Sequence, residues 1–104
     1  MYIADKTYNI TTNGTVILPV PANAQARWCL VRIIVNSKGA SSNTATLYDS
    51  DETTGANDEQ RIGKIDTTAN VGHIDYGIIM KKGIYIVVAT GTAPDLTVVY
   101  KEIF

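Results

Sequence analysis

This 104-residue chain has few of the residues from which catalytic and metal sites are built. It holds one cysteine, Cys29, and one histidine, His73. A single cysteine excludes an intrachain disulfide, and a structural zinc site needs three or four converging ligands. The sequence contains no Gly-x-Ser-x-Gly elbow and no glycine-rich phosphate loop. We therefore expect no enzyme activity, no catalytic or metal-ligating residues and no cofactor.

Charge and long hydrophobic stretches are also scarce. Charged residues make up 18% of the chain and the formal net charge is −1, so no strong field attracts nucleic acid or an anionic membrane. No run of eighteen apolar residues predicts a membrane span, and the first residues lack the pattern of a secretory signal. We expect neither nucleic acid nor membrane as a partner.

Helix signals are nearly absent, whereas strand signals recur about every ten residues. We predict one all-β domain over residues 1–104, a β-sandwich of about eight short antiparallel strands with jelly-roll or immunoglobulin-like wiring. The expected strands are Lys6–Thr11, Thr15–Val20, Ala26–Val35, Thr44–Ser50, Arg61–Thr67, Gly72–Ile78, Gly83–Thr90 and Asp95–Ile103.

The first part of the chain is predicted to be an extended segment with a tight turn. Asn13-Gly14 lies between two strand-like runs, which favours a β-hairpin. Pro19 and Pro21 exclude a central strand, since proline cannot donate to the ladder. Residues 1–26 are therefore expected to form an edge strand, a hairpin or an arm that reaches a neighbour.

Two predicted strands are apolar on both faces. In Trp28–Val35 we expect Trp28, Leu30 and Ile34 on one face, and Cys29, Val31, Ile33 and Val35 on the other. In Gly83–Thr90 we expect the side with Tyr85, Val87 and Ala89 to face a partner, because a tyrosine hydroxyl tolerates water in the free state. Surplus apolar faces of this kind are usually covered by another subunit or by a folded-back segment. The predicted interface residues are Trp28, Leu30, Ile34, Tyr85, Val87, Pro19 and Pro21.

The stretch Asp49–Glu59 contains five of the ten acidic residues. A solvated surface loop is the first interpretation, because the EF-hand spacing is missing. A calcium site and a contact with basic groups of a partner are alternatives.

The order of these strand patterns resembles small structural proteins of tailed-phage virions, of the capsid decoration (cement) or head-fibre type. The resemblance extends from about Ala26 to Tyr100 and rests on strand patterns. The matching stretches are Trp28–Val35, Ser37–Ser42, Ala45–Asp49, Ile62–Thr68, Gly72–Gly77, Lys82–Gly91 and Leu96–Tyr100.

The resemblance implies a virion part, made in the host cytoplasm and located on the capsid surface. We expect a homo-oligomer, most simply a trimer, that binds the major capsid protein and stabilises the shell by burying apolar surface. The alternative is a head or tail fibre or a carbohydrate- or receptor-binding module, with loops Ser37–Asn43 and Thr53–Asn57 as the site.

Overall fold

The computed structural model describes residues 5–20, 26–51, 60–69 and 72–103. Most of the described residues lie in β-strands, and the described part contains no helix long and apolar enough to cross a membrane. The strands are β1 (Lys6–Ile10), β2 (Gly14–Pro19), β3 (Arg27–Ser37), β4 (Thr44–Asp49), β5 (Arg61–Asp66), β6 (Gly72–Met80), β7 (Gly83–Ala89) and β8 (Asp95–Ile103). The all-β prediction is confirmed.

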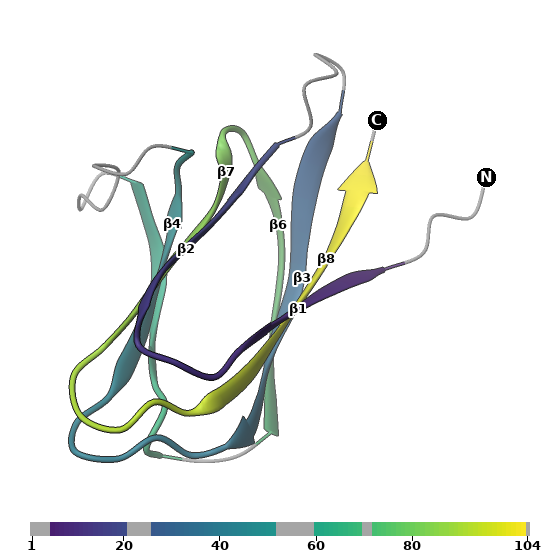
Figure 1. The fold of residues 1–104 in the computed structure, drawn as a ribbon. Coiled ribbons are helices and arrows are strands. Elements are labelled where there is room, and N and C mark those ends of the chain that lie inside the picture. Colours follow the sequence, from purple (N-terminus) through teal and green to yellow (C-terminus); the bar gives the residue numbers. More distant parts are fainter. Residues whose placement is uncertain (1–4, 21–25, 52–59, 70–71, 104) are drawn as a thin grey trace.

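The strands form two four-stranded antiparallel sheets that pack face to face (Figure 1). Sheet A has the order β1-β8-β3-β6, and sheet B has the order β2-β7-β4-β5. The chain changes sheet at every connection except the one between β4 and β5. This order is that of a jelly roll and differs from the immunoglobulin order, in which the first two strands are neighbours. The β-sandwich is confirmed, and the strand order decides between the two predicted wirings.

The predicted hairpin at Asn13-Gly14 is wrong. β1 pairs with β8 and β2 pairs with β7, so the two strands are edge strands of different sheets. The Asn13 side chain donates to the carbonyl oxygen of Gly91 at 2.9 Å, which ties this corner to the β7–β8 loop. The local turn signal is overridden because each strand buries apolar side chains against a longer partner, for example Ile10 beside Leu96.

Residues 6–19 are thus part of the sandwich, which corrects the expectation of a free arm or hairpin over residues 1–26. Removing residues 1–26 would delete an edge strand from each sheet. The prediction that Pro19 marks an edge strand is confirmed, since Pro19 is the last residue of edge strand β2. Pro21 lies outside the described residues.

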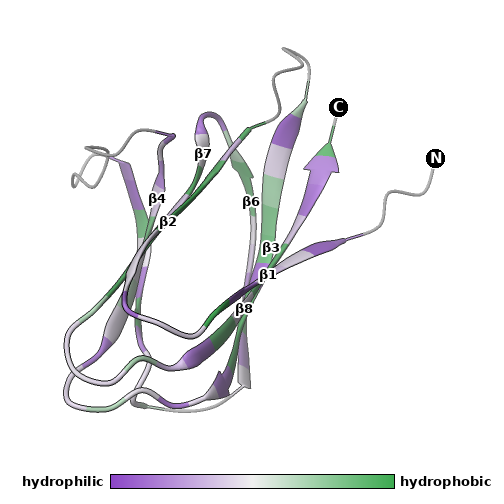
Figure 2. Cartoon of the chain, viewed as in Figure 1, coloured by the Kyte–Doolittle hydropathy of each residue, from purple (hydrophilic) through white to green (hydrophobic). Residues whose placement is uncertain are grey.

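The core fills the space between the sheets, and hydrophobic residues recur along β2, β3, β6 and β7 (Figure 2). Strand β7 sends Ile84, Ile86 and Val88 into it, each at most 1% exposed. Full burial of such a side chain contributes roughly 1.5–3 kcal/mol. Since alternate residues of a strand point to opposite faces, Tyr85, Val87 and Ala89 form the outward set of β7.

The faces of β3 differ from the prediction because the strand is irregular. Relative to β8, Leu30 pairs with Tyr100 and Arg32 with Val99, so Val31 is an extra residue. This bulge shifts the alternation by one and places Leu30 on the core side together with Ile33 and Val35. Ile34 lies on the opposite, outward side. The predicted grouping of Leu30 with Ile34 is therefore wrong.

Candidate interaction surfaces

The outer face of sheet B carries an apolar cluster, here called the tyrosine face: Ile17 of β2, Tyr48 of β4, and Tyr85 and Val87 of β7. The register places Tyr85 between Ile17 and Tyr48. The two tyrosine rings meet edge to face, with centroids 5.8 Å apart, a favourable arrangement for aromatic pairs. Tyr85 is 3% exposed although it lies outside the core cluster, while Val87, Ile17 and Tyr48 are half-buried. Two predicted interface residues, Tyr85 and Val87, thus lie on the same outer side of sheet B, but only Val87 is partly accessible to a partner.

Two other predicted interface residues make intramolecular contacts. Trp28 donates its indole Nε1 hydrogen to the carbonyl oxygen of Pro19 at 2.8 Å, which links β3 of sheet A to β2 of sheet B. Its ring meets Tyr100 edge to face at 4.9 Å. Leu30 is fully buried in the core, so its side chain is not accessible to a partner.

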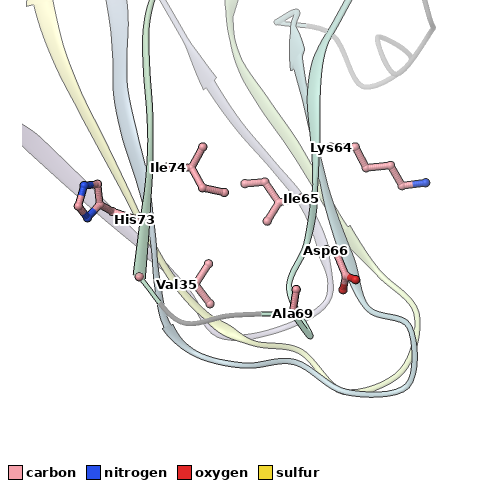
Figure 3. Close-up of a pocket in the computed structure, with 8 residues that line it drawn as sticks. Val35, Lys64, Ile65, Asp66, Ala69, His73 and Ile74 are labelled. Atoms are coloured by element: carbon pink, nitrogen blue, oxygen red, sulfur yellow. The ribbon is translucent and has the colours of Figure 1, made fainter.

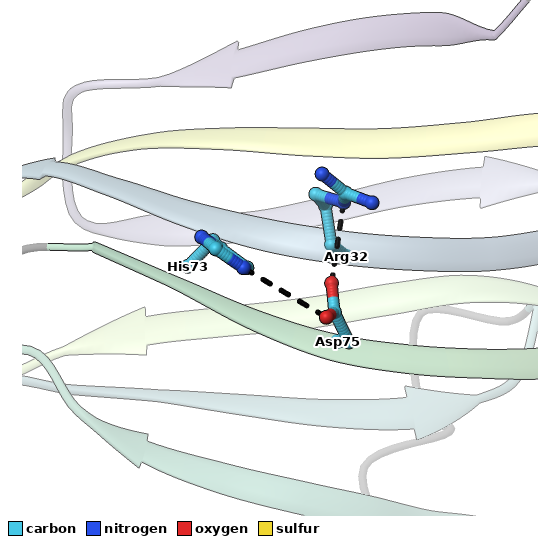
Figure 4. A network of polar contacts seen from close by, with 3 residues as sticks. All are labelled: Arg32, His73 and Asp75. Carbon is cyan, nitrogen blue, oxygen red and sulfur yellow. Dashed lines mark ion pairs between the residues drawn. The ribbon is translucent and has the colours of Figure 1, made fainter.

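The outer face of sheet A combines charged and apolar side chains. Arg32 Nε lies 3.3 Å from Asp75 Oδ1, and His73 Nε2 lies 3.8 Å from Asp75 Oδ2 (Figure 4). The Arg32 Nε atom is shielded from solvent and makes no hydrogen bond, so the contact with Asp75 is an ion pair without hydrogen-bond geometry. All three side chains are about half exposed, and pairs of this kind contribute about 0–1 kcal/mol.

Apolar side chains flank this network. Ile34 is half-buried beside His73, and Ile79 is 56% exposed beside Cys29. Ile79 is the most exposed large hydrophobic side chain of the described residues. Ile34 is one of the interface residues predicted from the sequence, whereas Ile79 is not among them.

A cleft of about 410 Å³ opens between edge strands β5 and β6 (Figure 3). Val35, Ile65, Ala69 and Ile74 line its apolar part. Ile74 is opposite Ile33 in the ladder and therefore on the core side of β6, yet it is 39% exposed because the sheets separate here. Farther along, Tyr76 covers Gly63 of β5, and burial raises the pKa of the Tyr76 phenol. Nothing local in the sequence indicated this cleft, because it depends on which strands are at the edges.

The charged residues of the cleft are at its rim. Lys64 and His73 extend away from the space between the sheets (Figure 3). Asp66 accepts hydrogen bonds from the Thr68 hydroxyl at 2.6 Å and the Thr68 backbone N–H at 2.9 Å. The bond from the Thr68 hydroxyl, and to a smaller extent the bond from the Thr68 backbone, hold the pKa of Asp66 below its usual range. This carboxylate is therefore anionic at neutral pH.

Asp49, the first residue of the predicted acidic loop, has a structural partner. Its carboxylate accepts the backbone N–H groups of Lys81, Lys82 and Gly83 at 2.8–3.3 Å, which fixes the β6–β7 turn. No group of three or more potential metal ligands occurs among the described residues. Residues 52–59 lie outside the described residues, and they include the predicted glycan loop Thr53–Asn57. The alternative of a calcium site in the acidic loop therefore stays a prediction.

The other predicted glycan loop, Ser37–Asn43, is hydrogen-bonded through Asn43 to the neighbouring loops at its end of the sandwich. Asn43 is fully buried and donates to Asn13 Oδ1 at 2.8 Å and to the Thr90 carbonyl oxygen at 2.7 Å. Asn43 Oδ1 accepts the Thr67 hydroxyl at 2.7 Å. One buried amide thus joins four loops, a role that the sequence did not reveal because its partners are distant in the chain.

No protein-family profile and no curated protein matches this chain. Among solved structures it is similar to a chain from the work described as "Bacillus endospore appendages form a novel family of disulfide-linked pili". The TM-score is 0.57 at 12% sequence identity, covering 96% of this chain and 85% of that chain. At this identity the likeness shows a shared fold.

Proposed function

We propose that this protein is a non-enzymatic structural subunit that works by packing against other proteins in a large assembly. The observation that carries the proposal is the tyrosine face. A two-sheet sandwich needs one apolar face per strand for its own core. Strand β7 has that face in Ile84, Ile86 and Val88, and it adds Tyr85 and Val87 on the other side.

The type of assembly that we propose is a phage virion, with this chain as a decoration protein on the outer capsid shell. The support is the sequence resemblance to small virion proteins. The jelly roll is compatible with it, although the same fold serves many functions. The pilus subunit with a similar fold is also a part of an assembly, which favours this class of function in general terms.

The proposed mechanism is burial of apolar surface between this subunit and the shell, with the subunit as a cyclic trimer. If about 400 Å² of apolar surface is buried per subunit, the transfer free energy is on the order of 10 kcal/mol before the cost of association. The half-buried Tyr48 is suited to such a face because its ring supplies apolar area and its hydroxyl tolerates water in the free subunit.

A glycan- or receptor-binding role has less support. Within Ser37–Asn43, Gly39 and Ala40 donate backbone hydrogen bonds to Thr67 and Thr92. Asn43, the residue of this loop with the most hydrogen-bonding capacity, is fully buried.

The test is the location and copy number of this chain in purified particles. We expect hundreds of copies on the shell, seen as density in a particle reconstruction. Val87→Asp should lower occupancy at least tenfold without unfolding the protein, because Val87 is outside the core. Lys38→Asp, at an exposed residue of the β3–β4 loop, is the control and should bind like the wild type. A dozen or fewer copies at a neck or tail, or full occupancy with Val87→Asp, would refute the proposal.

A further inference from the structure

The dipeptide Asn13-Gly14, which does not form the predicted hairpin, lies where the chain passes from sheet A to sheet B. Asn13 is one of seven asparagines and the only one that glycine follows. Asparagine before glycine is the dipeptide most prone to deamidation, because glycine has no side chain to hinder attack of its backbone nitrogen on the preceding amide. Both residues are exposed, so the water that the reaction consumes reaches them.

The fold requires each of these two residues at its position. Asn13 Nδ2 donates to the Gly91 carbonyl oxygen at 2.9 Å, and Asn13 Oδ1 accepts from Asn43 Nδ2 at 2.8 Å. The amide thus joins the β1–β2 connection to the β3–β4 and β7–β8 loops. Gly14 has φ +141°, a conformation that other residues rarely adopt. The reactive dipeptide is therefore a consequence of how the chain crosses between the sheets.

The same two hydrogen bonds oppose deamidation in the folded protein. Attack on Asn13 Cγ makes this carbon tetrahedral, so Nδ2 and Oδ1 leave the plane in which Gly91 and Asn43 bind them. Asn43 does not follow this movement, because it is fully buried and also bonded to Thr67 and Thr90. The loss of two hydrogen bonds of ordinary strength slows the reaction by roughly tenfold or more.

We propose that Asn13 is a deamidation site that the hydrogen bonds to Gly91 and Asn43 protect in the folded sandwich and that becomes reactive when this corner opens. The Gly14 backbone nitrogen gives its proton to hydroxide and forms a bond to Asn13 Cγ. The Cγ–Nδ2 bond then breaks and releases ammonia, which leaves a succinimide ring. One water molecule opens the ring at either carbonyl and yields aspartate or isoaspartate at position 13, with no change of oxidation state.

Both products weaken the corner. A carboxylate oxygen in the place of Nδ2 faces the Gly91 carbonyl oxygen, so an attraction becomes a repulsion. Isoaspartate also adds one carbon to the main chain within the short connection Thr11–Asn13 between β1 and β2. A subunit whose corner has stayed open long enough is therefore changed irreversibly and refolds to a less stable state. This chemistry is independent of the proposed structural role.

The experiment incubates the full chain at mildly alkaline pH, folded in buffer and unfolded in guanidinium chloride. Mass spectrometry of the tryptic peptide Thr7–Arg27 detects the exchange of an amide NH₂ for OH, and fragment ions distinguish Asn13 from Asn9 and Asn23. Gly14→Ala is the chemical control, because its methyl group hinders the attack in both states.

Two further variants separate local protection from overall stability. Asn43→Ala removes the donor to Asn13 Oδ1. Asp49→Ala is the matched control, because it weakens the β6–β7 turn at the opposite end of the sandwich (Figure 1). The variants are compared at a temperature at which circular dichroism shows both folded. If Asn43→Ala does not fold, Thr67→Val takes its place, since it loosens the same amide.

We expect Asn13 to deamidate at least tenfold faster in guanidinium chloride than in the folded wild type. Asn43→Ala should accelerate the folded-state reaction about fivefold, the effect of one hydrogen bond, and Asp49→Ala should leave it within about twofold. Asn13→Asp, which reproduces one product, should unfold at a lower denaturant concentration than the wild type. Equal rates in the folded and unfolded states, an acceleration by Asp49→Ala as large as that by Asn43→Ala, or an Asn13→Asp variant as stable as the wild type would overturn the proposal.

Discussion

Asn43 offers the sharpest test of what holds this sandwich together. Its side chain makes three hydrogen bonds of 2.7–2.8 Å to Asn13, Thr67 and Thr90. Each bond contributes about 1 kcal/mol net, and buried partners left unsatisfied cost more than exposed ones. The Thr67 hydroxyl retains a second acceptor, the Asn43 backbone oxygen at 3.2 Å. We therefore expect Asn43→Ala to lower the free energy of unfolding by about 2–4 kcal/mol.

The measurement is urea denaturation with a thermal melt, where this loss corresponds to a fall in Tm on the order of 10–15 °C. Asn36→Ala is the control. The exposed Asn36 amide donates to Asp95 and Thr97, so the same substitution removes a similar number of bonds in water. We expect it to cost less than about 1 kcal/mol. If both variants lose the same small amount, the buried network does not stabilise the fold as we argue.

Three further predictions concern turns and pH. Gly91→Ala should prevent folding or destabilise by more than about 3 kcal/mol, since Gly91 has φ +62° and a Cβ there would collide with the carbonyl oxygen of Ala40. Gly14→Ala, at φ +141° with open space around it, adds backbone strain without a collision and should remain folded on circular dichroism with a smaller loss of stability. Asp49→Ala removes three backbone hydrogen bonds and should cost about 1–3 kcal/mol, seen as a lower urea midpoint with an unchanged slope. The folded-state pKa of Asp66 lies below the ordinary value of 3.8, so its stabilisation is complete above that value and is lost as pH falls through the folded-state pKa. Thr68→Val should reduce this acid sensitivity, and an unchanged pH profile would argue against the Thr68 bonds as its cause.

Periodicity in the sequence was sufficient to locate the strands. The alternation in Ile84–Ala89 also predicted two usable faces, and the structure shows that Ile84 belongs to the core and Tyr85 to the outer side. Strand order was not predictable, because pairing between β1 and β8 depends on contacts between distant residues. Asn13-Gly14 illustrates the limit, since a strong local turn signal occurs where the chain passes between sheets.

The candidate surfaces were only partly predictable for the same reason. The residues around Val31 give no sign of a bulge. The bulge nevertheless reverses the expected alternation, so that Ile33 and Val35 share the core face with Leu30 and Ile34 does not. The alternation in His73-Ile74-Asp75 places Ile74 inward, but the space in front of it exists because β5 and β6 are both edge strands. A periodic pattern assigns a side chain to a face and does not say how closely the opposite sheet approaches.

The pairing of β1 with β8 also determines when this protein is able to fold. Lys6–Ile10 finds its ladder partner only when Leu96–Tyr100 has been synthesised, and β2 likewise waits for β7. Neither sheet is complete on an emerging chain, so folding must follow release of the final strand. Pairings between such distant segments slow folding and leave apolar strands exposed in the interval. Truncation before β8 should therefore yield an aggregating product instead of a smaller domain.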